Sequence, residues 1–276
     1  MAGESASEIF TLTIAPILGF LLANVMFFAS LPELQKYRKM NEWGSLNSHP
    51  YPIVVCNCIG WMMYGSVIKD YWVFVSNFPG LLVSVYALMI ALTLNAQNEK
   101  KRKELEKMTL VSCALLSAMG FVSGVVMHDE KEGKKRFASG IFCNVVLAMY
   151  YASPLSEMRQ IILERDASSL YWPMSVAITV NGFSWAAYGF ALQDWFLVSP
   201  NMFGGVLGVV QLAFLATFKN TKKKMMKSSS ISSVKIELEE RGGGGLGGGE
   251  EEEEEEINIV ANLSSEDLIV SGQPRS

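Results

Sequence analysis

The stretch NCIGWMMYG at residues 57–65 returns 124 positions later as NGFSWAAYG at residues 181–189. Over the 24 positions that begin at Asn57 and Asn181, seven residues are identical. Average composition would give roughly one or two identities by chance. The identical residues are mostly polar or aromatic, so a general apolar character does not explain them. The chain therefore contains an internal repeat, with the pairs Asn57/Asn181, Trp61/Trp185, Tyr64/Tyr188, Gly65/Gly189, Asp70/Asp194, Asn77/Asn201 and Gly80/Gly204.

Charged residues divide the chain into seven uncharged stretches and a tail. Half of the 276 residues are hydrophobic and the mean hydropathy is +0.25, yet 18% of the residues are charged. Residues 1–218 hold 15 acidic and 15 basic residues, so the formal net charge of −4 belongs to residues 219–276. The uncharged stretches are 9–32, 50–68, 71–98, 108–127, 137–156, 167–193 and 195–218.

Each uncharged stretch is long enough to cross a bilayer as a helix. A hydrocarbon core roughly 30 Å thick needs about 20 apolar residues, and the stretches hold between 19 and 28 residues. Seven of them leave almost no chain for a soluble domain. This composition excludes a cytosolic enzyme, a nucleic-acid-binding protein and a disulfide-rich secreted protein. We predict an all-α membrane protein with seven transmembrane helices, embedded in a lipid bilayer.

The repeat predicts how these helices are grouped. Pro50 matches Pro173, and Ala29-Ser30-Leu31-Pro32 resembles Ala152-Ser153-Pro154-Leu155, so helices 1–3 correspond to helices 5–7. One unpaired crossing, helix 4, lets the second triplet enter in the same orientation as the first, which gives two parallel three-helix bundles. The predicted domains are a first repeat over 1–98, a linker with helix 4 over 99–136, a second repeat over 137–218 and a disordered cytoplasmic tail over 219–276.

The loops alternate in their content of basic residues. Fifteen Lys and Arg residues fall on one side, in the loops after the odd-numbered helices and at the start of the tail, and five fall on the other, at Lys69 and within 131–136. The positive-inside rule places the N-terminus outside and the tail in the cytoplasm. Met1–Glu8 holds no basic residue, so we expect stretch 9–32 to be a retained transmembrane helix and not a signal peptide. We expect the plasma membrane as the location.

The repeated amides and indoles are the candidate binding residues. An amide inside a membrane helix is costly unless it is paired or faces water, and a Trp four residues after an Asn lies on the same helical face. Amides bridge pairs of hydroxyl groups and an indole packs on the apolar face of a pyranose, so this set favours a neutral polyol such as a sugar. Amides that join helices and indoles that fill a core are the alternative. The candidates are Asn57, Asn77, Asn181, Asn201, Trp61 and Trp185.

Prolines and Tyr–Asp pairs are the candidate gating residues. Proline removes a backbone hydrogen bond and permits a kink, so four prolines near the cytoplasmic helix ends are candidate hinges: Pro32, Pro50, Pro154 and Pro173. Proline also starts helices, which suits Pro50 and Pro173 better than the other two. On the opposite side, Tyr64 with Asp70 and Tyr188 with Asp194 are candidates for outer gating contacts, although exposed helix ends would explain them almost as well.

Ionisable residues are missing from the middle of every stretch. Proton- and sodium-driven carriers usually hold a buried carboxylate or histidine there, so we expect facilitated diffusion down a gradient. The four cysteines lie in apolar stretches and are expected to be small buried hydrophobic residues. His49 and His128 have no ligand cluster around them, so we expect no metal and no cofactor.

Over residues 9–218 the chain resembles the SWEET, or MtN3/saliva, family of sugar transporters. The resemblance depends on the 3+1+3 pattern, Pro50-Tyr51-Pro52, the segment MYYASPL at 149–155 and the two repeated blocks. It implies bidirectional uniport of mono- or disaccharides by alternating access. It further implies that Asn77 and Asn201 hydrogen-bond the sugar, that Trp61 and Trp185 stack on it, and that the four prolines form the family's proline tetrad.

Two departures from the family pattern favour a hexose over sucrose. Family members often carry small residues where this chain has Asn57, Trp61 and Asn181, so the pocket is expected to be tighter or more polar. Tyr150, one turn before Pro154, is bulky at a position that bears on sugar size in the family.

Three other functions are alternatives to sugar transport: a proton-coupled exporter, a seven-helix receptor and a transport-inactive sensor. A proton-coupled PQ-loop exporter of amino acids or other small solutes would carry Pro-Gln pairs, whereas this chain has Pro32-Glu33 and Pro154-Leu155. A seven-helix receptor would not need the triplet repeat, and a transport-inactive sensor or a homo-oligomer stays possible on sequence alone.

The tail combines a basic run at 222–227, a Gly-rich run and Glu250–Glu256, and its sequon at Asn262 is expected to stay unmodified in the cytoplasm.

Overall fold

The computed structural model describes residues 5–44 and 47–218, and in these residues every regular element is helical. The predictions for the basic run, the Gly-rich run and the acidic run of the tail fall on residues outside this part. The elements are α1 (Ala6–Ile9), η1 (Phe10–Ile14), α2 (Ala15–Phe28), α3 (Leu31–Met40), α4 (Pro50–Ile68), α5 (Tyr71–Leu94), α6 (Glu99–Phe121), η2 (Val122–Val126), α7 (Glu132–Glu164), α8 (Trp172–Ala191) and α9 (Trp195–Phe218).

The helices follow the uncharged stretches because charged residues are costly inside a bilayer and gather where helices end. Helix α4 covers the whole of stretch 50–68, and α9 covers the whole of stretch 195–218. Six helical segments in the described chain are long and apolar enough to span a membrane, and one of them runs from Ala6 through Met40. The seventh predicted span, α8, has spanning length at 20 residues. It is not among these six because Ser, Thr, Asn, Trp and Tyr are interspersed among its apolar residues.

The internal repeat is also visible in the backbone. Among the described residues, four that are not glycine have a positive φ angle: Asn41, Lys69, Arg165 and Gln193. They form two pairs, each separated by the same 124 positions as the sequence repeat. Lys69 is the C-cap of α4 and has φ 57°, and Gln193, in the turn after α8, has φ 53°. The same left-handed turn therefore leads into α5 and into α9.

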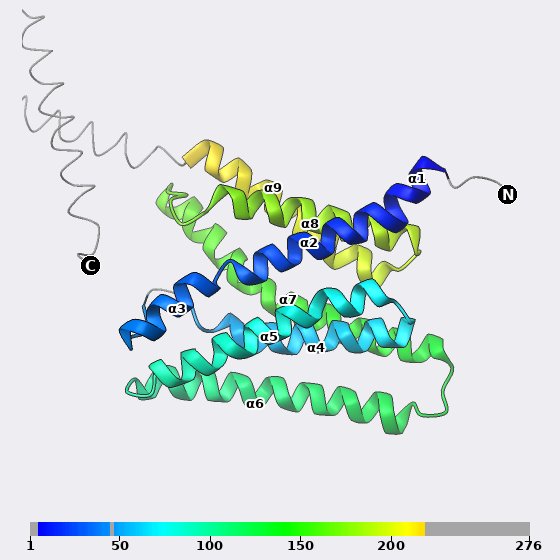
Figure 1. The fold of residues 1–276 in the computed structure, drawn as a ribbon, viewed down its shortest axis with the longest axis horizontal. Helices are drawn as coiled ribbons and strands as arrows, with labels where there is room; N and C mark the ends of the chain where they lie inside the picture. The colour runs from blue at the N-terminus through cyan, green and yellow to red at the C-terminus, as the bar shows by residue number, and fades with distance from the viewer. Residues whose placement is uncertain (1–4, 45–46, 219–276) are drawn as a thin grey trace, which may run out of the picture. The chain divides into compact units, whose positions relative to one another are not determined.

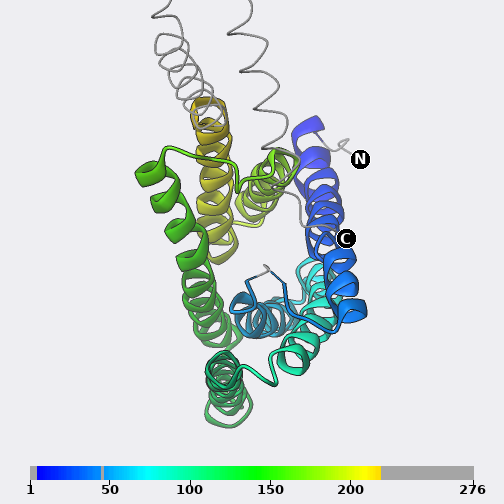
Figure 2. The same cartoon turned by 90° about the vertical axis from the view of Figure 1, so that its left-hand side faces the viewer.

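Most of the described chain, residues 5–44, 47–159 and 170–212, belongs to one compact unit, in which α4 contacts both α5 and α6. Helix α4 packs along α5, and α6 lies along α4 (Figure 1). Figure 2 shows α4, α5 and α6 nearly end-on as neighbours. Helix α2 packs against both α5 and α8. We call α2, α4 and α5 the first triplet and α7, α8 and α9 the second triplet.

Equivalent contacts recur in the two triplets. A Cβ added at Gly80 of α5 would meet the ring of Phe27, and a Cβ added at Gly204 of α9 would meet the hydroxyl of Tyr151. Phe27 and Tyr151 are themselves 124 positions apart. An aromatic side chain from the first helix of each triplet therefore lies close to the third helix.

Three of the four cysteines are buried as predicted, and one is not. Cys56, Cys58 and Cys143 are buried, whereas Cys113 is exposed. Cys113 lies on α6, the helix without a counterpart in the repeat, where few neighbours cover the side chains: only Leu105, Ser112 and Met119 are buried on this helix. The remaining described residues, 160–169 and 213–218, form part of a second unit that contains the ends of α7 and α9.

Candidate functional site

A cluster of buried side chains joins the two triplets. Three of its pairs are related by the repeat, namely Trp61 with Trp185, Tyr64 with Tyr188 and Val73 with Leu197. Ala15 of α2 and Cys143 of α7 complete the cluster, so all six helices of the two triplets contribute to it. The aromatic residues that the repeat shares therefore lie together in one core and not on separate surfaces.

Two hydrogen bonds connect the triplets at the end where α5 and α9 begin, which we call the Tyr–Asp end. The Tyr64 hydroxyl donates to Oδ2 of Asp194 at 2.6 Å, and the Tyr188 hydroxyl donates to Oδ2 of Asp70 at 2.5 Å. The sequence suggested Tyr64 with Asp70 and Tyr188 with Asp194, but each tyrosine bonds to the aspartate of the other triplet. Each aspartate uses its other oxygen, Oδ1, to cap its own helix, which leaves Oδ2 to accept from the tyrosine.

The capping contacts hold both carboxylates in place. Oδ1 of Asp70 accepts from the backbone N–H of Val73 at 2.9 Å, and Oδ1 of Asp194 accepts from the backbone N–H groups of Phe196 and Leu197 at 3.0 and 3.3 Å. Such side chains satisfy N–H groups that a helix leaves unpaired at its start. A tyrosine of one triplet therefore bonds to a group that is fixed rigidly in the other.

Two basic residues add charge at this end. The guanidinium of Arg136 lies 2.9 Å from Oδ2 of Asp194, whose side chain is 2% exposed. Lys69 lies 2.8 Å from Glu132, and this hydrogen bond raises the pKa of the Lys69 ammonium above its ordinary value. The second pair is exposed and contributes little to stability. The Arg136 pair involves a buried carboxylate, so removing the guanidinium would leave a buried charge without compensation.

The four predicted amides are half-buried and fall into two kinds. Nδ2 of Asn77 donates to the Val73 carbonyl and Nδ2 of Asn201 donates to the Leu197 carbonyl, both at 2.8 Å and both four residues back on the same helix. One N–H of each of these amides therefore bonds within its own helix. The side-chain carbonyl oxygen stays available to a ligand hydroxyl.

The second pair of amides is not symmetric. The indole N–H of Trp61 donates to Oδ1 of Asn57 at 3.1 Å. The equivalent oxygen, Oδ1 of Asn181, is buried and has no hydrogen-bond partner within residues 5–44 and 47–218. A buried acceptor without a partner is costly, which makes this atom the best-placed acceptor for a donor that arrives with a ligand.

Trp185 takes a different position from Trp61 because of Gly19. A Cβ added at Gly19 would lie 2.7 Å from Nε1 of Trp185, so only glycine allows the indole to lie this close to α2. Each indole also packs edge-on against the tyrosine that follows it by three residues. The ring centroids are 5.6 Å apart for Trp61 and Tyr64 and 6.0 Å apart for Trp185 and Tyr188. The candidate binding residues are thus in direct contact with the Tyr–Asp end.

The four prolines occupy two kinds of position. Pro50, Pro173 and Pro32 lie in the first turn of α4, α8 and α3, and Pro32 follows a break at residues 29–30. Pro154 lies inside the continuous helix α7. Helix-start geometry therefore suits Pro32 as well as Pro50 and Pro173, and the role of the four prolines as hinges stays a prediction.

Two further residues take part in the contacts around this region and were not selected from the sequence: Arg136 and Asn144. Pro200 inside α9 has no N–H, so the carbonyl of Phe196 lacks its usual helical partner. Nδ2 of Asn144 on α7 donates to that carbonyl at 3.1 Å. In the sequence, Pro200 in the middle of stretch 195–218 indicates that the carbonyl four residues earlier needs a hydrogen-bond donor from outside the helix. Asn144 therefore fastens α7 to α9 within the second triplet.

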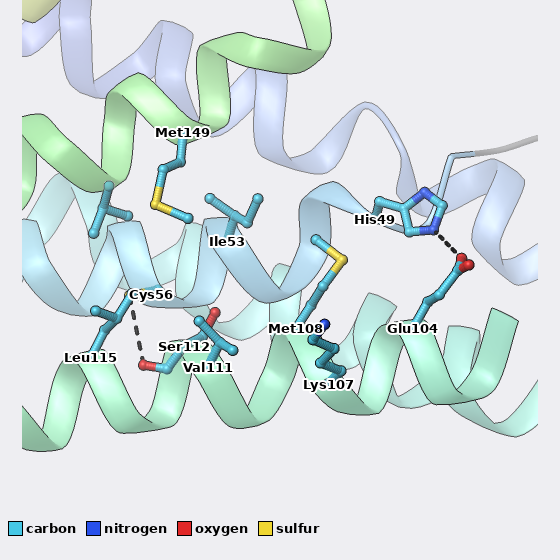
Figure 3. A pocket seen from close by; sticks show the side chains of 11 residues that line it. His49, Ile53, Cys56, Glu104, Lys107, Met108, Val111, Ser112, Leu115 and Met149 are labelled. Carbon is cyan, nitrogen blue, oxygen red and sulfur yellow. Dashed lines mark hydrogen bonds and ion pairs between the residues drawn. The ribbon is translucent and has the colours of Figure 1, made fainter. Parts of the chain in front are cut away.

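A cavity of about 300 Å³ lies between α4, α6 and α7, apart from the predicted binding residues (Figure 3). Apolar side chains line most of it, among them Ile53, Val111 and Met149. His49 lies 3.2 Å from Glu104 at its polar end. None of the six candidate binding residues lines this cavity, so we do not assign it to the same site.

Known proteins share both the repeat and the fold. The family model described as sugar efflux transporter for intercellular exchange matches the chain twice, over residues 14–101 and 137–223. The bidirectional sugar transporter SWEET13 of Arabidopsis thaliana is 27% identical over 232 residues, which cover 80% of this chain and 76% of that protein. The bidirectional sugar transporter SWEET12 of Oryza sativa subsp. japonica is 24% identical over 221 residues, which cover 80% and 73%. A solved structure of a eukaryotic SWEET transporter at 3.7 Å resolution superimposes with a TM-score of 0.68 at 20% identity and covers 78% of this chain and 99% of that one.

Proposed function

The chain belongs to the family of sugar efflux transporters for intercellular exchange, and from this premise we propose that it moves a sugar across a membrane in either direction by alternating access. The observation that carries the proposal is the contact between each candidate sugar-stacking indole and a gate tyrosine, Trp61 with Tyr64 and Trp185 with Tyr188. Through this contact, a sugar that displaces an indole also shifts the tyrosine hydroxyl that closes the Tyr–Asp end.

The proposed sugar site combines free acceptors with flat apolar surfaces. The carbonyl oxygens of Asn77 and Asn201 and the unpaired Oδ1 of Asn181 would accept hydroxyl protons of the sugar. Trp185, 7% exposed, and Trp61, 6% exposed, would cover its apolar faces. This is the usual composition of a small-molecule site, mostly apolar with a few polar groups that fix orientation.

The burial pattern supports a state closed at the Tyr–Asp end. Tyr64 is fully buried and Asp194 is 1% exposed, whereas Pro32 is exposed and Pro50, Pro154 and Pro173 are half-buried at the opposite helix ends. Opening the Tyr–Asp end would break the two crossed hydrogen bonds, because each joins one triplet to the other.

We propose uniport and not proton coupling. The buried carboxylate that a proton-driven carrier would need is present only at the Tyr–Asp end of the described chain, as Asp194, and there it is paired with Arg136 and Tyr64. Both of its oxygens are engaged there, Oδ2 by the tyrosine hydroxyl and the guanidinium and Oδ1 by backbone N–H groups at the start of α9, so we assign Asp194 to the structure of this end.

A hexose is the proposed substrate. Tyr150 is half-buried, and its ring lies 6.0 Å from that of Tyr151. A bulky residue one turn before Pro154 supports the smaller sugar, because this position bears on sugar size in the family.

Sugar uptake into proteoliposomes tests this function. We expect labelled glucose or fructose to equilibrate faster than sucrose, at the same rate with and without an imposed pH gradient, and to exchange against unlabelled sugar inside. An uptake rate that rises severalfold with an inward proton gradient would support the coupled exporter instead. No uptake of any of the three sugars would contradict sugar transport.

We further propose that the N-terminus lies outside the plasma membrane and the tail in the cytoplasm, because fifteen basic residues are predicted on one side and five on the other. An epitope before Ser5 should bind antibody on intact cells, and an epitope after Ser276 only after permeabilisation. Glycosidase treatment should leave the mobility unchanged, since Asn262 would stay in the cytoplasm. Antibody binding to the C-terminal epitope on intact cells would reverse the orientation.

A further inference from the structure

The carboxylate of Asp194 has a contact that the repeat does not account for. Its Oδ2 is shared by the Tyr64 hydroxyl at 2.6 Å and the Arg136 guanidinium at 2.9 Å. Its Oδ1 is occupied by the backbone N–H groups at the start of α9. Both oxygens of a nearly inaccessible carboxylate are therefore satisfied, and its negative charge is compensated.

Among the described residues, no basic side chain pairs with the matching carboxylate, Asp70. It accepts from the Val73 N–H at 2.9 Å and from the Tyr188 hydroxyl, and it is half-buried. The position that matches Arg136 at the repeat offset is Leu12, which has no charge. Lys69, the base beside Asp70 in the chain, is paired with Glu132 instead. The two halves of the Tyr–Asp end thus differ by one guanidinium.

Arg136 and Asp194 lie in the same triplet. Arg136 is on α7 and Asp194 precedes α9, and these two helices are also joined by Asn144, which donates to the Phe196 carbonyl at 3.1 Å. The Tyr64 hydroxyl, in contrast, comes from α4 of the first triplet. If the triplets separate, the Arg136–Asp194 pair can persist while the Tyr64 bond must break.

We propose that Arg136 is a positioning residue of the Tyr–Asp end, which acts as the outer gate. Its guanidinium makes the Tyr64–Asp194 bond the stronger of the two bonds that close this gate. A charge-assisted contact holds the carboxylate in one orientation for the tyrosine. Without the guanidinium, the carboxylate would lose this orientation, and the Tyr64 bond that closes the gate would weaken. The inference rests on the proposed alternating access, because it requires that this end opens.

A cysteine placed behind the closed gate measures how often it opens. Ala15 is 1% exposed and belongs to the same buried cluster as Tyr64 and Tyr188. The reporter chain is Ala15→Cys with the four native cysteines changed to alanine, and the measured quantity is the rate of maleimide labelling in proteoliposomes with reagent on both faces. We compare the labelling rates of the single variants Arg136→Gln, Arg136→Lys, Tyr64→Phe and Tyr188→Phe. We also compare each Arg136 variant combined with Tyr64→Phe or with Tyr188→Phe. The control is Lys134→Gln. Lys134 is exposed and pairs with Glu130, one turn before it on the same segment.

We expect Arg136→Gln to accelerate labelling about tenfold, Arg136→Lys to restore part of the slow rate, and Lys134→Gln to leave it unchanged. In a double-mutant cycle, the effect of Arg136→Gln should largely disappear in the Tyr64→Phe background and persist in the Tyr188→Phe background. Equal labelling with and without Arg136, or full additivity with Tyr64→Phe, would overturn the inference while leaving alternating access intact.

Two further results are an Arg136→Gln variant that does not fold and a reporter thiol that is not labelled in the folded protein. If Arg136→Gln does not fold, the same two cycles with Arg136→Lys decide the question, and additivity in both would overturn the inference. If the reporter thiol introduced by Ala15→Cys is labelled only after denaturation, the Tyr–Asp end does not open, and both the inference and the proposed alternating access fail.

Discussion

Asn201→Ala and Trp185→Ala should each lower the rate of sugar uptake about tenfold or more at sugar concentrations below saturation. The Asn201 amide already gives one donor to the Leu197 carbonyl, so its carbonyl oxygen and second N–H are the groups left for the sugar. Two hydrogen bonds at about 0.5–1.5 kcal/mol each correspond to roughly five- to 150-fold in binding. Removing the indole of Trp185 also removes the flat apolar surface proposed to cover the sugar.

Matched variants separate a lost ligand contact from a damaged helix. Asn95 makes the same contact as Asn201, with Nδ2 donating to the carbonyl of Ala91 four residues back at 2.8 Å, but it caps the far end of α5. Asn95→Ala should therefore keep most of the uptake. Trp185→Phe, which keeps a flat ring against Gly19, should retain more uptake than Trp185→Ala.

The measurement is initial uptake of labelled glucose into proteoliposomes, with equal amounts of reconstituted protein. Asn201→Ala and Trp185→Ala proteins that are well folded and transport at the wild-type rate would remove these residues from the site, while the wild-type uptake would still support sugar transport. The reverse outcome, in which Asn95→Ala is as inactive as Asn201→Ala, would mean that the loss comes from the helix and not from the ligand.

The spans and their order could be predicted from the sequence because their physical cause is local. A charge inside a bilayer costs several kcal/mol, so charges mark the ends of helices such as α9, which lies between Asp194 and Lys219. Side chains at a fixed spacing share a face, and the bond between Trp61 and Asn57 confirms that this holds for the first indole. The offset of 124 likewise predicts which residues are equivalent.

The contacts between the triplets could not be predicted in the same way. A spacing along one helix does not say which residue lies opposite, so Tyr64 was considered with Asp70, while the structure pairs it with Asp194. The sequence placed Arg136 only at the boundary of a stretch, because its partner is 58 residues away. The prediction that Cys113 is buried was wrong for a related reason, since apolar side chains in a membrane helix can face lipid as well as protein.

The repeat also conceals a difference in how closely its helices pack. A Cβ added at Gly182 of α8 would lie 2.5 Å from the Gly205 nitrogen and 2.7 Å from the Asn201 carbonyl oxygen, both backbone atoms of α9. The equivalent residue in the first triplet is Cys58, which is fully buried on α4. Helices α8 and α9 therefore approach more closely than a side chain allows, at the turn that carries Asn201.

Gly182→Ala should consequently reduce both stability and uptake. Backbone atoms cannot rotate away, so α8 and α9 must separate, at a cost of about 1–3 kcal/mol and with a fall in melting temperature of roughly 3–10 °C. The displaced backbone is that of Asn201, so we expect uptake per folded molecule to fall as well.

Gly120→Ala is the matched control: Gly120 is a helical glycine of α6 with nothing within 4 Å of an added Cβ. There the alanine should raise stability slightly, by about 0.5–1 kcal/mol, and leave uptake unchanged. Thermal unfolding and uptake of the two variants measure both quantities, and a Gly182→Ala protein as stable and active as Gly120→Ala would show that the contact between α8 and α9 does not position Asn201.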